Sequence, residues 1–206
     1  MRSADHAGSN EAQPCAPDDL RVDARRNVRS ILEAAARVLA EDPAASVQEI
    51  ADKAEVSRPT VYRHFSNREE LIDAIRLEAM TQARERLEAA AASSEPAADA
   101  LERLILDFAG IVARYPLLAA LFGTQPRPKD QGPPKGLIDA FDSLVARGRR
   151  DGTLRPDLRG EILGPVTMGA LIMALKIGGL RGSDPHDVGA EVAAMILGGA
   201  RAAGSS

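Results

Sequence analysis

Four residues between positions 57 and 65 carry groups that can bind the edge of a nucleic-acid base. Arg58 and Arg63 end in guanidinium groups, which bind the O6 and N7 atoms of guanine in pairs. Thr60 can offer a hydroxyl to a base edge and a methyl group to thymine. Together with Pro59, these residues form the candidate base-reading set.

A helix over residues 57–65 would sort these side chains onto two faces. Because each residue turns about 100° from the last, Val61 and Phe65 fall on one side and face a core, whereas Pro59, Thr60 and Arg63 point outward. Tyr62 lies at the flank. The pattern there fits a residue at the core boundary and a phosphate contact equally well.

No other cluster of side chains has the composition of a catalytic or metal site. Cys15 is the only cysteine, and His6, His64 and His186 lack Cys or carboxylate partners at ligand spacing. We therefore predict that the protein is not an enzyme and that it uses no metal and no cofactor.

The net charge of −4 is unusual for a protein that binds nucleic acid, but the charge is unevenly distributed. Residues 1–20 hold an acidic excess. The segment 56–68 contains three arginines and no acidic residue. A local basic surface is therefore expected within an acidic chain.

Short helices with capping residues must position the candidate residues. Ser46 and Glu49 form a capping box at the start of a second helix, Ser57 caps a third, and Asn67 repeats the pattern for a fourth. The tight turn at residues 54–57 joins the second and third helices into a helix-turn-helix. The later helix of such a motif fits the major groove of DNA.

Apolar residues at three- and four-residue spacing predict helices along the rest of the chain. Residues 1–20 have the composition of a disordered arm, and the Pro-rich residues 123–136 have that of a loop. Gly152 is expected to end one helix, and Ser183-Asp184-Pro185 to begin the last. With 3% aromatic residues, almost no sheet is expected.

Neither a membrane span nor a secretory signal is predicted. The longest uncharged apolar stretch, between Glu161 and Lys176, is short and interrupted by Gly164, Pro165 and Gly169. The N-terminus lacks the apolar core of a signal peptide. We therefore predict a cytoplasmic protein.

Residues 46–71, SVQEIADKAEVSRPTVYRHFSNREEL, closely resemble the N-terminal module of TetR-like bacterial transcriptional regulators. The resemblance covers about Arg25 to Ala74. Two positions depart from the family pattern, Glu55 in place of a turn glycine and Arg68 in place of lysine. Because glycine reaches left-handed backbone conformations readily and glutamate does not, Glu55 predicts a strained or altered turn.

The resemblance implies an all-α protein of about nine helices. Residues 1–20 would be the arm, residues 21–74 a three-helix DNA-binding domain with the helix-turn-helix, and residues 75–203 a helical domain for effector binding and dimerisation. In the family, Ser46, Tyr62, His64 and Arg68 correspond to phosphate contacts. Our sequence adds three arginines at the start of the first helix as candidates for the DNA backbone, namely Arg25, Arg26 and Arg29.

The resemblance also implies a pocket for a small organic effector. Seven residues are candidates to line it: Leu104, Phe108, Tyr115, Phe122, Phe141, Met168 and Met173. Each of them would be an ordinary core residue in most proteins, and the sequence favours neither interpretation. The apolar last two helices imply a homodimer, which would match the two half-sites of a palindromic operator on double-stranded DNA.

The leading hypothesis is a homodimeric repressor that a small organic effector of unknown identity releases from its operator. The alternative is a helical ligand-binding or protein-interaction module that keeps a degenerate DNA-binding head. The acidic charge and Glu55 favour the alternative. A steep fall of DNA affinity with added salt would separate the two.

Overall fold

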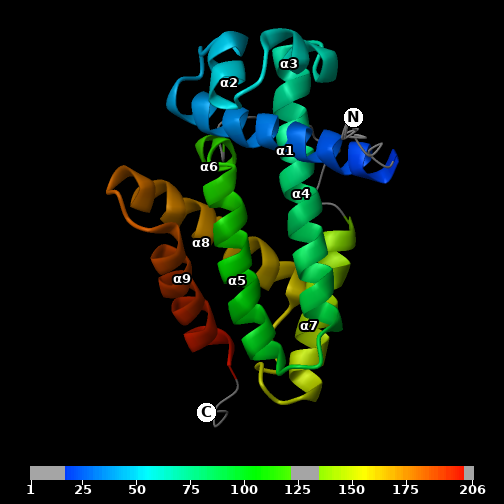
Figure 1. The fold of residues 1–206 in the computed structure, drawn as a ribbon. Helices are drawn as coiled ribbons and strands as arrows, with labels where there is room; N and C mark the ends of the chain where they lie inside the picture. The colour runs from blue at the N-terminus through cyan, green and yellow to red at the C-terminus, as the bar shows by residue number, and fades with distance from the viewer. Residues whose placement is uncertain (1–16, 122–134, 202–206) are drawn as a thin grey trace, which may run out of the picture.

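The computed structural model describes residues 17–121 and 135–201 (Figure 1). Within these ranges the chain forms nine helices, and its one extended pairing is an isolated bridge between Leu154 and Arg201. The helices are α1 (Pro17–Glu41), α2 (Val47–Lys53), α3 (Arg58–His64), α4 (Arg68–Ala92), α5 (Ala97–Arg114), α6 (Leu117–Leu121), α7 (Lys135–Arg150), α8 (Gly160–Leu180) and α9 (Pro185–Ala200). The all-α prediction is confirmed.

Local capping sets where four of the helices begin. In each case a side-chain oxygen accepts a hydrogen bond from a backbone N–H of the first turn, which has no partner inside the helix. The pairs are Ser46 with Glu49 at 3.2 Å, Ser57 with Thr60 at 3.3 Å, Asn67 with Glu70 at 2.9 Å and Asp184 with His186 at 2.8 Å. All four caps are those that the sequence predicts.

The helices pack into two groups, one at each end of the molecule. At one end α1 packs against α2 and α4, and α2 packs against α3; at the other end α5 packs against α4, α8 and α9 (Figure 1). α4 runs from the first group into the second. The largest fully buried side chains are found in both groups: Ile31, Leu39, Ile50, Leu71, Ile75, Leu87, Leu101, Leu104, Ile105, Phe108, Tyr115 and Leu144.

Several helix boundaries differ from the sequence predictions. α1 begins at Pro17, so its first turn includes residues 17–20 of the segment predicted to be a disordered arm. The predicted loop 123–136 lies largely outside the described residues, and α7 already begins at Lys135. α8 begins at Gly160 and continues through Pro165, which removes one helical hydrogen bond without ending the helix.

The first turn of α5 is capped by a distant part of the chain. Pro96, at the capping position, makes no side-chain hydrogen bond there. Instead the N–H of Ala97 donates to Asp151 at 2.9 Å, and the N–H of Ala98 donates to the Thr153 hydroxyl at 3.2 Å. The turn after α7 therefore satisfies backbone donors that the local sequence leaves open.

Arg147 fastens the last turn of α7 to the end of α4. Its guanidinium donates to the carbonyl of Ala90 at 2.8 Å and to the carbonyls of Ser93 and Glu95. The end of a helix leaves such carbonyls without intrahelical donors. Gly152 follows with φ of 74°, the left-handed conformation that the predicted glycine end requires.

α8 carries an apolar surface that the described chain leaves uncovered. By length and composition it is the one described helix that could cross a membrane, a test that core helices of soluble proteins also pass. Its exposed apolar residues follow one side of the helix, and Met195 of α9 is 79% exposed as well. We call this surface the α8 stripe: Ile162, Val166, Met173, Ile177 and Leu180.

Candidate nucleic-acid interface

α3 presents the two faces that the sequence predicts. Val61 and Phe65 are buried, whereas Arg58, Pro59 and Arg63 are exposed at the end of the molecule opposite the C-terminus (Figure 1). Pro59 sits in the first turn, where its missing N–H leaves no helical hydrogen bond unmade. The helix can therefore present its outer face to a groove while its inner face stays anchored.

Arg58 and Tyr62 form a pair on this outer face. The guanidinium carbon of Arg58 lies 5.3 Å from the centre of the Tyr62 ring, and its Nη2 donates to the Tyr62 hydroxyl at 3.4 Å. Tyr62 is 43% exposed, so the structure places it on the surface and not at the core boundary. The contact holds the Arg58 guanidinium over an aromatic face and limits the directions in which it can point.

Thr60 and His64 are less exposed than the arginines of α3. Thr60 is half-buried, and its hydroxyl and that of Ser57 are 2.7 Å apart, with one donating to the other. His64 is also half-buried, with its ring centre 6.2 Å from that of Phe65. Arg63 is exposed, and no hydrogen bond or ion pair joins it to another described residue.

The turn before α3 keeps a left-handed residue although no glycine is present. Glu55 has φ of 56°, the only non-glycine residue with positive φ in the described chain. Hydrogen bonds close the turn around it, from Glu55 N–H to Asp52 at 3.2 Å and from Val56 N–H to Ala51 at 3.0 Å. Glu55 is thus strained, as its replacement of glycine predicts, while the turn stays closed. The left-handed conformation costs about 1–2 kcal/mol.

The hydroxyl and the backbone N–H of Ser46 both make hydrogen bonds within its capping box. Its hydroxyl donates to Glu49 at 2.8 Å, and its backbone N–H donates to the same carboxylate oxygen at 2.7 Å. These two hydrogen bonds hold the pKa of Glu49 below its ordinary value, and the one from the backbone N–H has the larger effect. A phosphate at Ser46 would lie beside this carboxylate, and the phosphate contact of Ser46 stays a prediction.

Two of the arginines predicted to contact phosphates bind other parts of the protein. Arg68 donates to the carbonyl of Ala45 at 2.9 Å and to that of Pro43, which ties the start of α4 to the segment before α2. Arg29 donates from Nε to Glu78 at 3.0 Å. The side chains of Arg25 and Arg26 lie outside the described residues. Phosphate contacts by these four arginines remain predictions.

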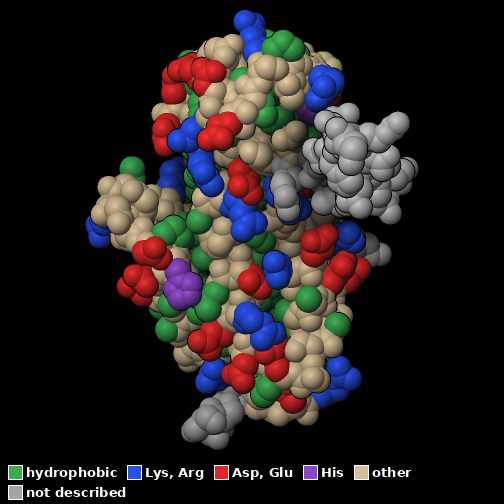
Figure 2. Space-filling model, in the orientation of Figure 1, with side chains coloured by type: hydrophobic (Ala, Val, Ile, Leu, Met, Phe, Trp, Pro, Cys, Tyr) green, Lys and Arg blue, Asp and Glu red, His purple; other side chains and the backbone are tan. Residues whose placement is uncertain are grey.

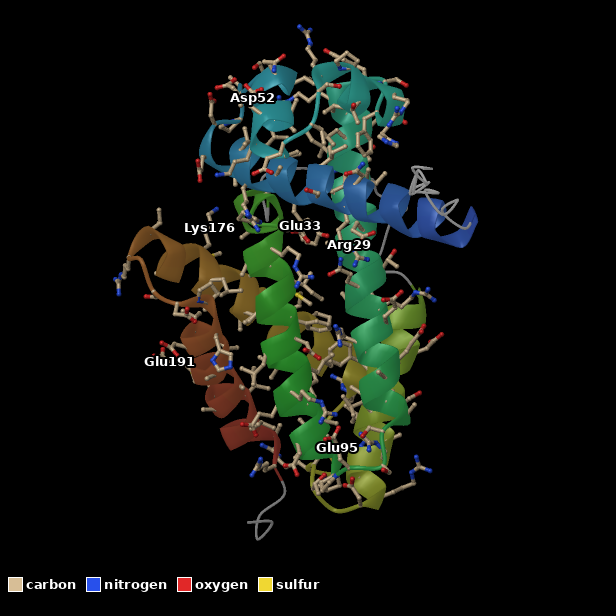
Figure 3. The ribbon with its side chains drawn as sticks, viewed as in Figure 1. Arg29, Glu33, Asp52, Glu95, Lys176 and Glu191 are labelled. Carbon is tan, nitrogen blue, oxygen red and sulfur yellow. The ribbon has the colours of Figure 1, made fainter. Side chains whose placement is uncertain are left out.

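A chain of polar side chains leads from α1 to α5. Arg29 and Glu33 both extend from α1 toward α4 and α5 (Figure 3). The Glu78 oxygen that accepts from Arg29 also accepts from Gln82 at 2.8 Å, and the Glu33 carboxylate lies 3.5 Å from Nε of Arg114. We call these groups, with Tyr115, the polar network.

Gln82 stands at the centre of the polar network. Its amide nitrogen donates to the Tyr115 hydroxyl at 3.1 Å, and its amide oxygen accepts from Arg114 at 3.0 Å. Burial of Tyr115, and then the negative charges of Glu78 and Glu33, raise the pKa of the tyrosine hydroxyl. Tyr115 therefore stays neutral, and hydrogen bonds join α1 through α4 to the end of α5.

The structure brings together only part of the predicted effector pocket. Leu104, Phe108, Tyr115 and Phe141 are buried, and the rings of Phe108 and Phe141 are 6.5 Å apart. Met168 packs half-buried against this group. The two remaining residues do not join it in the described structure: Met173 lies on the surface, 45% exposed, and Phe122 is outside the described residues.

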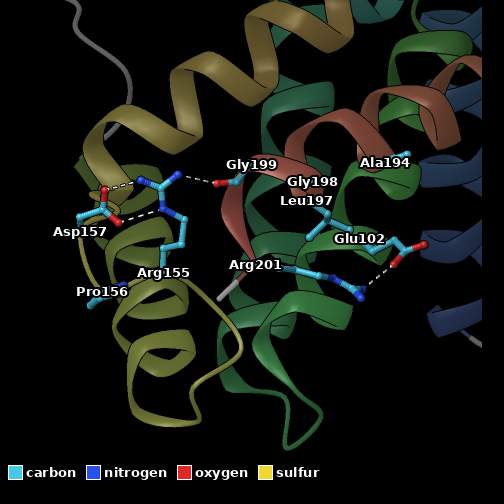
Figure 4. Close-up of a pocket in the computed structure, with 9 residues that line it drawn as sticks. All are labelled: Glu102, Arg155, Pro156, Asp157, Ala194, Leu197, Gly198, Gly199 and Arg201. Atoms are coloured by element: carbon cyan, nitrogen blue, oxygen red, sulfur yellow. Dashed lines mark hydrogen bonds and ion pairs between the residues drawn. The ribbon is translucent and has the colours of Figure 1, made fainter. Parts of the chain in front are cut away.

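A cleft of about 1010 Å³ opens elsewhere, where the turn after α7 meets α9 (Figure 4). Arg155 is paired there with Asp157 at 2.6 Å, and Arg201 lies 3.4 Å from Glu102. These residues are far apart in sequence, and nothing in their spacing predicts the cleft. Both arginines that line the cleft form ion pairs with carboxylates.

The sequence analysis misses two buried polar residues, Gln82 and Thr167. Apart from the tyrosine Tyr115, they are the only fully buried polar side chains among the described residues. A signal was available: Gln82 follows Leu71, Ile75 and Ala79 on one side of α4, and Thr167 follows Leu163 on α8 at four-residue spacing. A polar residue at a core position of a helix needs a partner or a ligand.

Comparison with known proteins agrees with this arrangement. Residues 31–75, from the middle of α1 to the beginning of α4, match the family model described as bacterial regulatory proteins, tetR family. The match contains the helix-turn-helix and the whole candidate base-reading set. No curated protein matches the chain.

Solved structures share the fold along most of the chain. The fatty acid degradation regulator FadR from Bacillus halodurans is 22% identical, with a TM-score of 0.62, over 82% of this chain and 97% of that one. SmeT, the repressor of a Stenotrophomonas maltophilia multidrug efflux pump, is 18% identical, with a TM-score of 0.63, over 86% and 91%. A TetR family regulator from Marinobacter aquaeolei is 20% identical, with a TM-score of 0.58, over 88% and 99%.

Proposed function

Because the chain is TetR-like in its fold and in its helix-turn-helix segment, we propose that it is a sequence-specific, DNA-binding transcriptional regulator. The observation that carries the proposal is the outer face of α3. Arg58 and Arg63 are exposed there with no acidic residue between them, on a helix anchored by Val61 and Phe65.

In the proposed complex, α3 lies in the major groove. Arg58 and Arg63 bind guanine O6 and N7, and Pro59 and the Thr60 methyl group contact thymine. Tyr62 and His64 lie beside the groove and contact phosphates, which set the position of the helix without reading sequence. On the face drawn in Figure 2, acidic and basic side chains are interspersed along the whole molecule. The basic groups proposed to read DNA are therefore the exposed arginines of α3, Arg58 and Arg63.

We propose that two copies join through the α8 stripe and Met195. An apolar face of this extent marks contact with another surface, and a second copy would cover it symmetrically. The dimer would set two α3 helices about 34 Å apart, one turn of DNA, and so select a palindromic operator. Sedimentation at micromolar concentration tests this: a monomer would reject the dimer.

The regulator would act in the cytoplasm as a repressor that a small organic effector releases from DNA. SmeT is named as a repressor, and a FadR structure is described in complex with stearoyl-CoA. By analogy, we propose residues 21–74 as the DNA-binding head and residues 75–203 as the domain that binds the effector. The polar network offers a route by which a shift of α5 could move α1 and α4.

The decisive experiment measures DNA binding directly. Fragments of the source genome are selected with the purified protein, and their affinity is compared with that of Arg63→Ala and of a control, Arg84→Ala on the outer side of α4. Arg63→Ala should weaken binding by about 1–3 kcal/mol and leave the fold intact. The control should bind like the original protein.

The same fragments also test the alternative of a degenerate head. Glu55 favoured that alternative in the sequence, yet the turn around it is closed by backbone hydrogen bonds. Affinity that falls steeply with added salt supports the regulator, because each phosphate contact releases counterions. Absence of any selected fragment would reject the proposed function.

A further inference from the structure

Thr167 on α8 is a buried hydroxyl without a partner. The residue is 1% exposed, and its Oγ1 makes no hydrogen bond in the described structure. Leaving a buried hydroxyl unpaired destabilises a fold, and such groups are rare in native proteins. A buried hydroxyl that no protein group bonds is therefore a candidate binding group for a ligand.

The side of α8 that carries Thr167 faces α7. A Cβ at Gly160 would lie 2.6 Å from the backbone of Asp142, and one at Gly164 would lie 2.9 Å from the ring of Phe141. Thr167 continues this line by one turn of the helix, and Leu171 continues it by another. Its hydroxyl is thus held among the side chains between α7 and α8.

The interior of the described chain is apolar and uncharged. The core contains Leu104, Phe108 and Phe141, and no Asp, Glu, Lys or Arg of the described chain is fully buried. Gln82, the other buried polar residue, already has its amide bonded to Tyr115 and Arg114. Thr167 Oγ1 is therefore the one buried side-chain oxygen of the described chain that makes no hydrogen bond; the other unpartnered buried atoms, Nε of Arg147 and Nε of Arg201, belong to guanidinium groups that are bonded through their other nitrogens.

This chemistry restricts what the interior can accept. An ionised ligand would lose its hydration without gaining an opposite charge, which is strongly unfavourable. A neutral ligand would lose little, and one oxygen on it could accept from the Thr167 hydroxyl. Met168, half-buried between two apolar clusters, has an unbranched side chain that can move to admit it.

Resting on the proposed function, we infer that the effector is a neutral, mostly apolar molecule with one hydrogen-bonding oxygen, and that Thr167 binds that oxygen. The inference assigns a ligand class to the domain and a polar contact that the sequence does not reveal. It separates this protein from regulators whose effectors carry charged groups.

Two dyes test the ligand class. Nile red is neutral and apolar and has one ring carbonyl, whereas 1-anilinonaphthalene-8-sulfonate is an apolar anion. We expect saturable binding of Nile red near one dye per chain, with blue-shifted emission, and clearly weaker binding of the sulfonate. Tighter binding of the sulfonate, or no saturable binding of Nile red, would overturn the inference.

Variants at position 167 test the contact itself. Thr167→Val keeps the shape and removes the hydroxyl, so Nile red affinity should fall roughly tenfold, the effect of one hydrogen bond. Thr167→Ser should restore most of the affinity. Thr81→Val, which removes the hydroxyl of a half-buried threonine on α4 that donates to the Leu77 carbonyl, should not change it. Equal affinity of Thr167→Val and the original protein would refute the assignment.

DNA binding measured without dye distinguishes a failure of this inference from a failure of the proposed function. Thr167→Val should bind the selected DNA fragments as the original protein does, and its urea midpoint should be equal or higher because the unpaired hydroxyl is gone. DNA binding without any Thr167-dependent dye binding would reject this inference alone. Failure to bind DNA would instead reject the proposed function.

Discussion

The amide nitrogen of Gln82 donates to the hydroxyl of Tyr115 at 3.1 Å, across 33 positions of the sequence. The bond joins α4 to α5 in a part of the molecule where both side chains are withdrawn from solvent. Arg114 donates to the oxygen of the same amide, and the amide nitrogen also donates to Glu78, so one side chain has three partners. Gln82 therefore holds α4 against the two residues at the end of α5, Arg114 and Tyr115.

Replacing Gln82 with leucine should destabilise the protein by about 1–3 kcal/mol, because it leaves the Tyr115 hydroxyl without a donor. Urea unfolding measures the change. Adding Tyr115→Phe to Gln82→Leu should recover part of the loss, since the hydroxyl that lacks a partner is then removed. Strictly additive losses in the double variant would contradict the coupling.

Tyr115 should ionise only at a pH above the ordinary tyrosine value of about 10. Burial, followed by the charges of Glu78 and Glu33, raises its pKa, so its contribution to stability is present below pH 10 and is lost as pH rises through the folded value. Absorbance at alkaline pH follows the two tyrosines of the chain. Tyr115→Phe should remove the late part of the titration, and an unchanged curve would contradict the burial.

The sequence predicts contacts that are local, and the structure adds those that join distant segments. Ser46, Ser57 and Asn67 cap their helices through bonds three residues long, so type and spacing suffice. Arg29 and Arg68 look like free cations in the sequence because their partners stand 49 and 23 residues away.

The candidate base-reading set is predictable for the same reason. Helical geometry alone separates Val61 from Arg63, and burial agrees with it. The effector pocket is less predictable, because apolar residues on amphipathic helices look alike whether they line a pocket or fill a core. Met173 illustrates the difficulty, since its apolar side chain lies on the α8 stripe.

Glu55→Gly should stabilise the protein, by up to about 1 kcal/mol. Glycine adopts φ of 56° without strain, although its larger loss of backbone entropy offsets part of the gain. Glu55→Ala serves as the control, because alanine also has a Cβ and should give no such gain. Thermal unfolding compares the three proteins, and equal midpoints for glycine and alanine would contradict strain at this turn.

Substitutions at Tyr62 should affect DNA binding more than stability. Tyr62→Phe keeps the ring beneath Arg58 and loses only the hydroxyl, whereas Tyr62→Ala also loses a cation–π contact of about 0.5–1 kcal/mol. Operator affinity should therefore fall in the order tyrosine, phenylalanine, alanine. A large drop in the unfolding midpoint would show instead that Tyr62 belongs to the core.

Asp151→Ala should destabilise the protein by about 1 kcal/mol through loss of the cap on α5. Burial raises the pKa of Asp151, but hydrogen bonds from Thr153 and Ala97 outweigh it, and the net shift is downward. The cap's contribution is thus present above about pH 4 and is lost as pH falls through the folded pKa. Urea midpoints at neutral and acid pH should differ less in Asp151→Ala than in the original protein.

The contacts of Arg29 and Glu33 have a consequence for protein engineering. Their partners, Glu78 and Arg114, both lie beyond residue 74, where the DNA-binding head would conventionally be cut. A fragment that stops at Ala74 leaves Arg29 without Glu78 and leaves Glu33 with Arg37, 4.0 Å away on α1, as its remaining partner. A chimera that joins residues 21–74 to a foreign effector domain loses both contacts with the rest of the chain. Portable versions of the head should therefore carry α4 through Gln82 and be paired with a recipient that supplies an arginine in the place of Arg114.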